Sequence, residues 1–167
     1  MLRLTTDPMP VVRVGFIGLG MRGPGAVERF TYLDGVEIEA LCALYPDRVE
    51  KSQEILAGRN LPAAAAYSGE EGWKELCRRD DIDLVYICTP WQLHVPMAVY
   101  AMEHGKHVAV EVPAAMSLEE CWQLVDTAEK TQRHCMMLEN CVYDFFELTT
   151  LNMAQHGLCL LYTSPSP

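Results

Sequence analysis

The chain has 167 residues, a formal net charge of -10, and a composition that is 50% hydrophobic and 22% charged. This length suits one ordinary domain, and this composition favours a packed core over a disordered chain. The acidic balance makes nucleic acid an unexpected partner, and no apolar run reaches the roughly 18 residues that a membrane-spanning helix needs.

Strand-like and helix-like segments alternate along the chain. The first segment, 12–17, is a continuous apolar run, which is typical of a strand covered on both faces. We expect six strands, at 12–17, 36–44, 64–67 (the weakest), 82–90, 107–112 and 135–140. We expect six helices, at 25–33, 45–59, 68–79, around 95–102, 117–131 and 143–156. This alternation predicts an α/β fold, a doubly wound parallel sheet of the Rossmann type.

Local signals mark the ends and the buried faces of these helices. Pro46 suits the first turn of the second helix, and Gly58 suits its end. Ser68 is the expected N-cap of the third helix, and Ser117 with Glu120 forms a capping box for the fifth. The residues expected to be buried are Val95, Ala98, Val99 and Met102 on the fourth helix, and Cys121, Trp122, Leu124, Val125 and Ala128 on the fifth.

The cysteines and histidines give no sign of a metal centre. The seven cysteines are scattered, odd in number and without CxxC spacing, which favours reduced, buried thiols. The five histidines include no HExxH pair. We therefore expect no bound metal.

A glycine-rich loop follows the first strand. Gly18, Gly20 and Gly23 form the pattern GxGxxG between an apolar strand and a helix, which is the context of a dinucleotide-binding loop. Gly18 would allow the tight turn, Gly20 the approach of a pyrophosphate, and Gly23 close packing of the helix on the sheet. The alternative is a glycine turn with a purely structural role.

The end of the second strand departs from this pattern. An acid is expected there, where its carboxylate would bond the adenosine ribose, but the position is Ala43. Asp47 lies four residues further on, where a carboxylate usually acts as a helix-capping partner. Arg22 and Arg48 leave open NADP, with its 2′-phosphate, as an alternative to NAD.

Polar and aromatic residues follow the next three strands, and ligands of such sheets bind at this edge. Trp91 and His94 follow the fourth strand, where the nicotinamide ribose would lie. For Trp91 the alternative is simple packing, and for His94 a helix-start residue with a satisfied side chain. Glu111 ends the fifth strand and needs a hydrogen-bond donor if buried, and Asn140 follows the sixth.

Three stretches together, "GFIGLGMRG", "CTPWQLHVPMAVYAMEHGKHVAVEVPAA" and "MLENCVYDFFELTTLNM", carry a family resemblance from 11 to 158. They resemble the glucose–fructose oxidoreductase and inositol dehydrogenase superfamily (Gfo/Idh/MocA). More narrowly, they are similar to family 109 of the glycoside hydrolases, the NAD-dependent α-N-acetylgalactosaminidase group. The resemblance implies an NAD site that contains Met21, Arg22, Ala43, Trp91, Gln92, Leu93, His94, Glu111, Val112 and Asn140, besides the three glycines.

One residue separates two kinds of enzyme within this superfamily. Its sugar dehydrogenases usually have Glu-Lys-Pro after the fifth strand, where the lysine assists proton transfer, whereas this chain has Glu111-Val112-Pro113. Because valine cannot move a proton, the residue favours the glycosidase group.

The chemistry that the resemblance implies is redox-assisted hydrolysis. Bound NAD would oxidise the sugar C3 hydroxyl, the C2 proton would become acidic, the glycosidic oxygen would leave by elimination, water would add, and the hydride would return. The family's acid–base residues lie in a second domain, so no catalytic residue is assigned here. The alternatives are an NAD(P)-dependent sugar oxidoreductase, and an isolated fragment that binds a nucleotide without catalysis.

The same comparison suggests how the chain is divided. We expect an extension at 1–10, the dinucleotide-binding domain at 11–142, and the first helix of a truncated substrate domain at 143–158. The residues 159–167, "CLLYTSPSP", resemble the translation of a sequencing adaptor and are expected to be non-native. The start lacks signal-peptide features, which predicts a cytoplasmic protein, or a periplasmic or exported one if an upstream signal is missing. We expect a carbohydrate substrate and leave a homo-oligomer open.

Overall fold

A computed structural model describes residues 5–139 and 143–157. Its centre is a six-stranded parallel sheet in the order β3-β2-β1-β4-β5-β6. The strands are β1 (Val12–Ile17), β2 (Val36–Ala43), β3 (Ala65–Ser68), β4 (Leu84–Ile87), β5 (His107–Glu111) and β6 (Cys135–Leu138). The strand order reverses between β1 and β4, so the crevice for a ligand is expected at their carboxyl ends.

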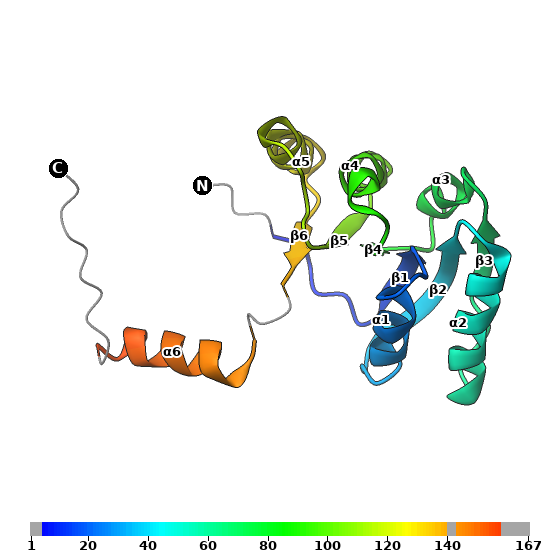
Figure 1. The fold of residues 1–167 in the computed structure, drawn as a ribbon, viewed down its shortest axis with the longest axis horizontal. Coiled ribbons are helices and arrows are strands. Elements are labelled where there is room, and N and C mark those ends of the chain that lie inside the picture. Colours follow the sequence, from blue (N-terminus) through cyan, green and yellow to red (C-terminus); the bar gives the residue numbers. More distant parts are fainter. Residues whose placement is uncertain (1–4, 140–142, 158–167) are drawn as a thin grey trace.

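Helices cover both faces of this sheet. They are α1 (Gly23–Phe30), α2 (Pro46–Gly58), α3 (Gly72–Cys77), α4 (His94–Glu103), α5 (Leu118–Thr131) and α6 (Phe145–Gln155), with a short 3₁₀ turn, η1 (Trp91–Leu93), before α4. Figure 1 shows α1 and α2 on one side of the sheet and α3, α4 and α5 on the other. The sequence-based expectation of a doubly wound Rossmann sheet is confirmed.

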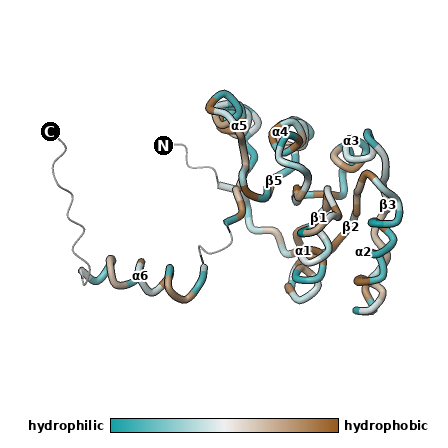
Figure 2. The backbone as a smooth tube through the Cα atoms, in the orientation of Figure 1, coloured by the Kyte–Doolittle hydropathy of each residue, from teal (hydrophilic) through white to brown (hydrophobic). Residues whose placement is uncertain are grey.

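Two hydrophobic cores hold these layers together, one on each face. One core joins the sheet to α1 and α2 through residues such as Val27 and Leu56. The other joins it to α3, α4 and α5 through residues such as Leu76, Ala98 and Leu124. Figure 2 shows hydrophobic residues concentrated along the central strands, while hydrophobic and hydrophilic residues alternate along the helices. A strand buried on both faces must be apolar throughout, which explains the continuous run at the end of β1.

The expected N-cap of α3 is wrong. Ser68 is the last residue of β3, where it pairs with Ala43 of β2. The helix begins four residues later at Gly72, with Glu71 in the N-cap position and no side-chain cap. Pairing with the neighbouring strand therefore decided the state of Ser68, and the local capping preference did not.

The expected buried face of α5 is only partly correct. Leu124 and Ala128 are buried, but Cys121 is exposed, Trp122 is 60% exposed and Val125 is 47% exposed. The helix packs against α4 and β6, and these three residues lie outside that contact. The capping box is half present: the Glu120 amide donates to the Ser117 hydroxyl at 3.1 Å, but the Glu120 carboxylate accepts from the Met116 amide and not from the Ser117 amide.

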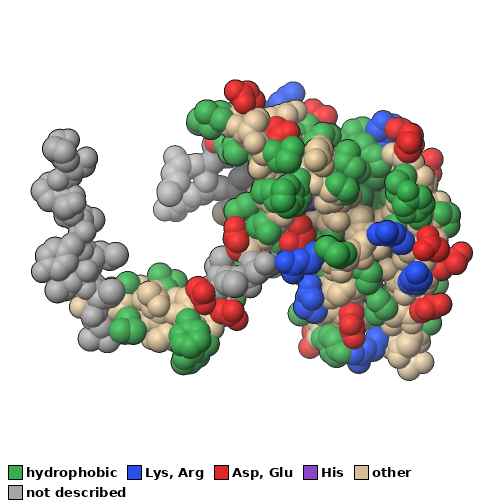
Figure 3. Space-filling model, viewed as in Figure 1, with side chains coloured by type: hydrophobic (Ala, Val, Ile, Leu, Met, Phe, Trp, Pro, Cys, Tyr) green, Lys and Arg blue, Asp and Glu red, His purple; other side chains and the backbone are tan. Residues whose placement is uncertain are grey.

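The segment after the sheet, which contains α6, differs from the other helices in its burial. No residue of α6 is buried, and Figure 3 shows hydrophobic side chains on its surface, at the left. The largest exposed side chains of this segment are Tyr143, Phe145 and Phe146. Within the ranges that the structure describes, no helix has the length and hydropathy to cross a membrane.

The burial of the cysteines agrees only partly with the expectation. Cys42 and Cys77 are buried, Cys88 and Cys135 are half-buried, and Cys121 is exposed. Burial raises the pKa of the thiols of Cys42 and Cys77 to about 12, so both stay protonated and unreactive near neutral pH. Cys141 and Cys159 lie outside the described residues.

Two glycines let α1 begin immediately beside β1. Gly18 has a φ of +96°, and a Cβ atom on it would lie 2.6 Å from the backbone of Cys88, the residue after β4. A Cβ atom on Gly23 would lie 2.1 Å from the carbonyl oxygen of Gly18. Both contacts are with backbone atoms, which cannot move aside as a flexible side chain can. The structure therefore gives these glycines the turn and the close packing that the sequence pattern predicts.

We expect the substitution Gly23→Ala to lower the free energy of unfolding by about 1–3 kcal/mol or more, because the added methyl group must displace backbone. Chemical denaturation followed by circular dichroism measures this loss. Gly58→Ala is the matched control, since nothing lies within 4 Å of its added Cβ atom and the residue is in a helix. A Gly23→Ala variant as stable as the Gly58→Ala variant would contradict the packing argument.

Candidate functional site

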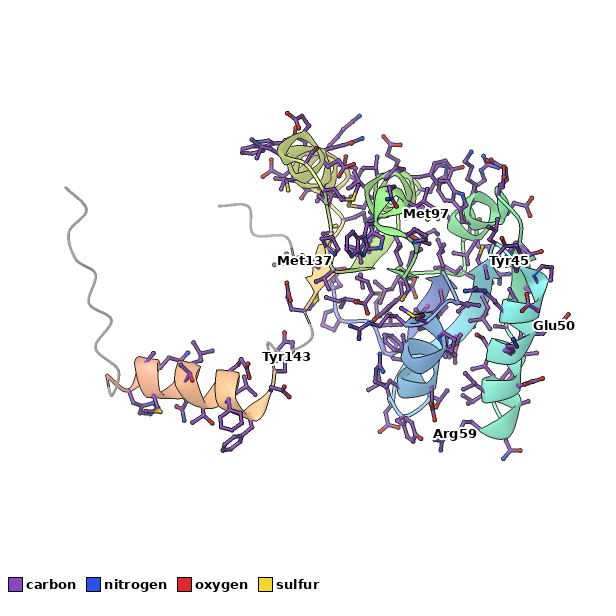
Figure 4. The ribbon with its side chains drawn as sticks, in the orientation of Figure 1. Tyr45, Glu50, Arg59, Met97, Met137 and Tyr143 are labelled. Atoms are coloured by element: carbon purple, nitrogen blue, oxygen red, sulfur yellow. The ribbon has the colours of Figure 1, made fainter. Side chains whose placement is uncertain are left out.

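A cavity of about 960 Å³ opens at the carboxyl ends of the strands. This volume is at the upper end of the roughly 300–1,000 Å³ of ligand sites. In Figure 4, Tyr45 at the start of α2 and Met97 on α4 lie at this end of the molecule, and Arg59 lies at the far end of α2. Ten of the residues predicted for the NAD site line the cavity: Gly18, Gly20, Met21, Arg22, Ala43, Trp91, Leu93, His94, Glu111 and Val112.

The glycine loop forms one wall of the cavity. Its start is fixed between two strands, because the Gly18 amide donates to the Cys42 carbonyl at 2.9 Å and the Cys88 amide donates to the Ile17 carbonyl at 2.8 Å. A Cβ atom on Gly20 would approach only the guanidinium of Arg48, at 3.0 Å, so the backbone here borders open space. Gly23 is buried beneath the loop and does not line the cavity.

The start of α1 supplies hydrogen-bond donors beside this loop. The N-cap residue, Arg22, makes no side-chain cap, and the first turn contains no acidic residue. The first amides of a helix have no partner within the helix, and together with the helix dipole they attract an anion. Pro24, the second residue of the helix, has no N–H group, so the donors for a pyrophosphate are the amides of the loop and of the other residues in the first turn.

The end of β2 forms the neighbouring wall. Ala43 is 5% exposed and lines the cavity, followed by Leu44 and Tyr45. The guanidinium of Arg48 lies 5.8 Å from the centre of the Tyr45 ring, within the range of a cation–π contact. The wall thus offers an aromatic ring and a cation, but no acceptor at the position of Ala43.

Glu111 has a donor that sequence reasoning did not identify. Its carboxylate is buried, with 8% of the residue exposed, and it accepts a 3.2 Å hydrogen bond from the Tyr86 hydroxyl. The Tyr86 ring is fixed by Phe16 and Phe30, whose ring centres lie 5.2 and 5.5 Å away. Burial, reinforced by nearby acidic groups, raises the pKa of Tyr86 well above its ordinary value. The hydroxyl therefore remains a donor, and it orients Glu111 at the cavity wall.

His94 is a buried residue at the start of α4, and its ring lies between two backbone carbonyl groups. It is 1% exposed, and both ring nitrogens face backbone carbonyl oxygens: Nδ1 lies 2.7 Å from Pro113 and Nε2 lies 2.8 Å from Thr89. Both nitrogens thus face the protein backbone, and the ring borders the cavity with neither nitrogen directed at a ligand. The histidine connects the segment after β4 with the segment after β5.

The remaining predicted residues of this side are placed as follows. Trp91 is 58% exposed and lines the cavity, so simple core packing does not explain it. Leu93 and Val112 also line the cavity. Gln92, in the middle of η1, is exposed and is not among the lining residues. Asn140 lies outside the described residues.

Several lining residues were missed by sequence reasoning. Gly69 and Glu70 follow β3, and Thr89 and Pro90 follow β4, so the rule that ligands bind at carboxyl ends could have found them. Trp73 and Met97 lie on the helices α3 and α4, and only the packing of these helices brings them to the cavity. No local sequence signal identifies the last two.

The fold, the cavity at its topological switch point and the open glycine loop together define a dinucleotide-binding Rossmann domain. A model of an oxidoreductase family with an NAD-binding Rossmann fold matches residues 12–139. The chain belongs to this family, Gfo/Idh/MocA, and it is an NAD-binding domain of that type.

Proteins with high sequence identity to the chain have more specific names than the family model. The chain is 69% identical over 156 residues to glycosyl hydrolase family 109 protein 1 from Bacteroides fragilis, a match that covers 93% of this chain. It is 60% identical over 157 residues to an alpha-N-acetylgalactosaminidase from the same species. The matches cover 34% and 37% of these proteins, so the chain spans about a third of the length of the curated relatives it matches.

Solved structures support the fold. A scyllo-inositol dehydrogenase from Lactobacillus casei, solved with NAD(H) and scyllo-inositol, matches 89% of this chain and 42% of its own, with a TM-score of 0.78 and 17% identity. At this identity the likeness concerns the fold alone.

We expect Tyr86→Phe to weaken NAD binding about two- to tenfold, because loss of the hydroxyl removes the hydrogen bond that orients Glu111. Titration calorimetry of the chain with NAD measures the change. Tyr67→Phe is the matched control, since the Tyr67 hydroxyl accepts a 3.3 Å hydrogen bond from Arg79 outside the cavity. Equal NAD affinity in both variants would show that Tyr86 does not support the site.

Proposed function

We propose that this chain is the cofactor-holding part of a redox-assisted glycoside hydrolase that acts on α-N-acetylgalactosaminides. The observation that carries the proposal is the 60% identity, over 94% of the chain, to a protein named alpha-N-acetylgalactosaminidase. The family 109 proteins among the relatives, at up to 69% identity, support the same conclusion.

The composition of the cavity wall supports this proposal over a lysine-dependent dehydrogenase. Val112 lies next to Glu111, where the dehydrogenases carry their lysine, and the described residues that line the cavity include no lysine. Lys106 is buried at the other end of β5, where its ammonium group donates to the carbonyl of Arg79. Proton transfer to the sugar would then depend on groups outside the described part of the chain.

The residues of this chain have positioning roles in the proposed mechanism. When bound, NAD supplies reversible hydride acceptance, which belongs to the cofactor and not to the protein. The glycine loop and Arg22 would hold the pyrophosphate, while Trp91 and Glu111 would orient the nicotinamide side. Glu111, held by Tyr86, would accept hydrogen bonds from ribose hydroxyls, which fixes the reactive face toward the substrate.

A sugar oxidoreductase of the same family is the second candidate. It is favoured by the family model itself, which describes oxidoreductases. It shares the dinucleotide site and differs in the fate of the hydride, which would remain on the reduced cofactor and not return to the sugar.

We further propose the division of the chain that the sequence suggests. Residues 143–158 would begin a substrate domain, in agreement with α6, which buries none of its residues. The segment 159–167 would be foreign, and it lies outside the described residues. Reading the parent DNA beyond codon 158 tests this division.

The glycosidase proposal is tested on the full-length protein that contains this chain. With an aryl α-N-acetylgalactosaminide and a catalytic amount of NAD, we expect release of the phenol without net formation of NADH. Stoichiometric accumulation of NADH, followed by its absorbance, would favour the oxidoreductase and overturn the glycosidase.

The chain alone is expected to bind NAD but to release no phenol from the same substrate, because a cofactor domain cannot hold a sugar against the nicotinamide. Calorimetry with NAD and a phenol assay measure the two properties separately. Turnover by the chain alone would contradict this division of labour.

A further inference from the structure

The cavity has an end that departs from the usual pattern of NAD sites. We call it the adenosine end; it is lined by Ala43, Leu44, Tyr45 and Arg48 beside β2, and by Gly69 and Glu70 beside β3. In Rossmann domains a carboxylate at the end of the second strand bonds the ribose 2′-hydroxyl. Ala43 occupies that position at the cavity wall, so this acceptor is missing.

Positive charge is available at the same place. Arg22 and Arg48 both line the cavity, and neither forms an ion pair with any part of the chain that the structure describes. Arg48 Nη1 lies 3.0 Å from the position of a Cβ atom on Gly20, so this guanidinium reaches from α2 to the glycine loop. It thus lies between the loop that would hold the pyrophosphate and the end of β2.

The nearby carboxylates do not neutralise Arg48. Asp47 does not line the cavity, and it lies 3.6 Å from the ammonium group of Lys51. Glu70 is the carboxylate on the cavity wall at this end, and it follows β3 and not β2. The acid that would repel a 2′-phosphate is therefore absent from the strand end, while a free guanidinium remains.

We propose that the adenosine end accepts a 2′-phosphate, so that the chain binds NADP at least as tightly as NAD. A carboxylate at this position selects a hydroxyl donor and repels a phosphate, whereas a guanidinium donates up to two parallel hydrogen bonds to a phosphate. Arg48 would make this contact, and Arg22 would remain with the pyrophosphate. The inference rests on the dinucleotide site and not on the proposed glycosidase activity.

The test compares ligands that differ only in the 2′-phosphate. Calorimetry of the chain with NAD and NADP, and with AMP and adenosine 2′,5′-bisphosphate, measures the contribution of that group directly. We expect the 2′-phosphorylated member of each pair to bind as tightly as its partner or more tightly. An NADP affinity below that of NAD overturns the inference but leaves the dinucleotide site intact, whereas no binding of either dinucleotide overturns both.

Variants assign the effect to Arg48. Arg48→Gln should weaken binding of adenosine 2′,5′-bisphosphate about tenfold, the scale of one charged hydrogen bond, and change AMP binding less than about twofold. Arg59→Gln is the matched control, because Arg59 stacks over Tyr32, 4.1 Å from the ring centre and away from the cavity. Equal losses for AMP and the bisphosphate would overturn the role of Arg48.

The reverse substitution gives a second, independent readout. Ala43→Asp should tighten NAD binding and weaken NADP binding, each about tenfold, because it restores the carboxylate. Circular dichroism shows whether this variant folds. If it does not fold, the comparison of ligands on the unsubstituted chain and on the Arg48→Gln variant still decides the question.

Discussion

The carbonyl oxygen of Gly18 lies 2.1 Å from the place that a Cβ atom of residue 23 would occupy, and the rest of the site depends on this closeness. Because α1 begins directly against the end of β1, the residues just before its first turn, Gly20 to Arg22, line the cavity at the strand ends. A longer connection would move these residues away from the strand ends, and the loop would no longer border the cavity. The two glycines thus let the strand-to-helix junction form a wall of the cavity.

The strands and the glycine loop could be predicted because their signals are local. A run of apolar residues identifies β1, and a glycine pattern between a strand and a helix identifies the turn. The parallel sheet with helices on both faces follows from the alternation of strands and helices, but the alternation does not determine the strand order. The cavity was found where parallel sheets usually bind ligands, at the strand ends.

What could not be predicted depends on contacts between distant segments. Tyr86 and Glu111 are 25 residues apart, and only the pairing of β4 with β5 brings the hydroxyl to the carboxylate. Trp73 reaches the cavity from α3 for the same kind of reason. Trp122 was predicted to be buried but is exposed. Its helix has a clear amphipathic pattern, but the neighbouring elements cover only part of its apolar face.

The two carbonyl contacts of His94 have a consequence for the far side of the cavity. His94 Nδ1 and Nε2 both lie within hydrogen-bond distance of a backbone carbonyl, but a neutral imidazole carries one N–H group, so it can donate to Pro113 or to Thr89 and not to both. Movement of one proton between the ring nitrogens would transfer the hydrogen bond from the segment after β5 to the segment after β4. The position of a single hydrogen atom therefore determines which of the two walls is held more firmly.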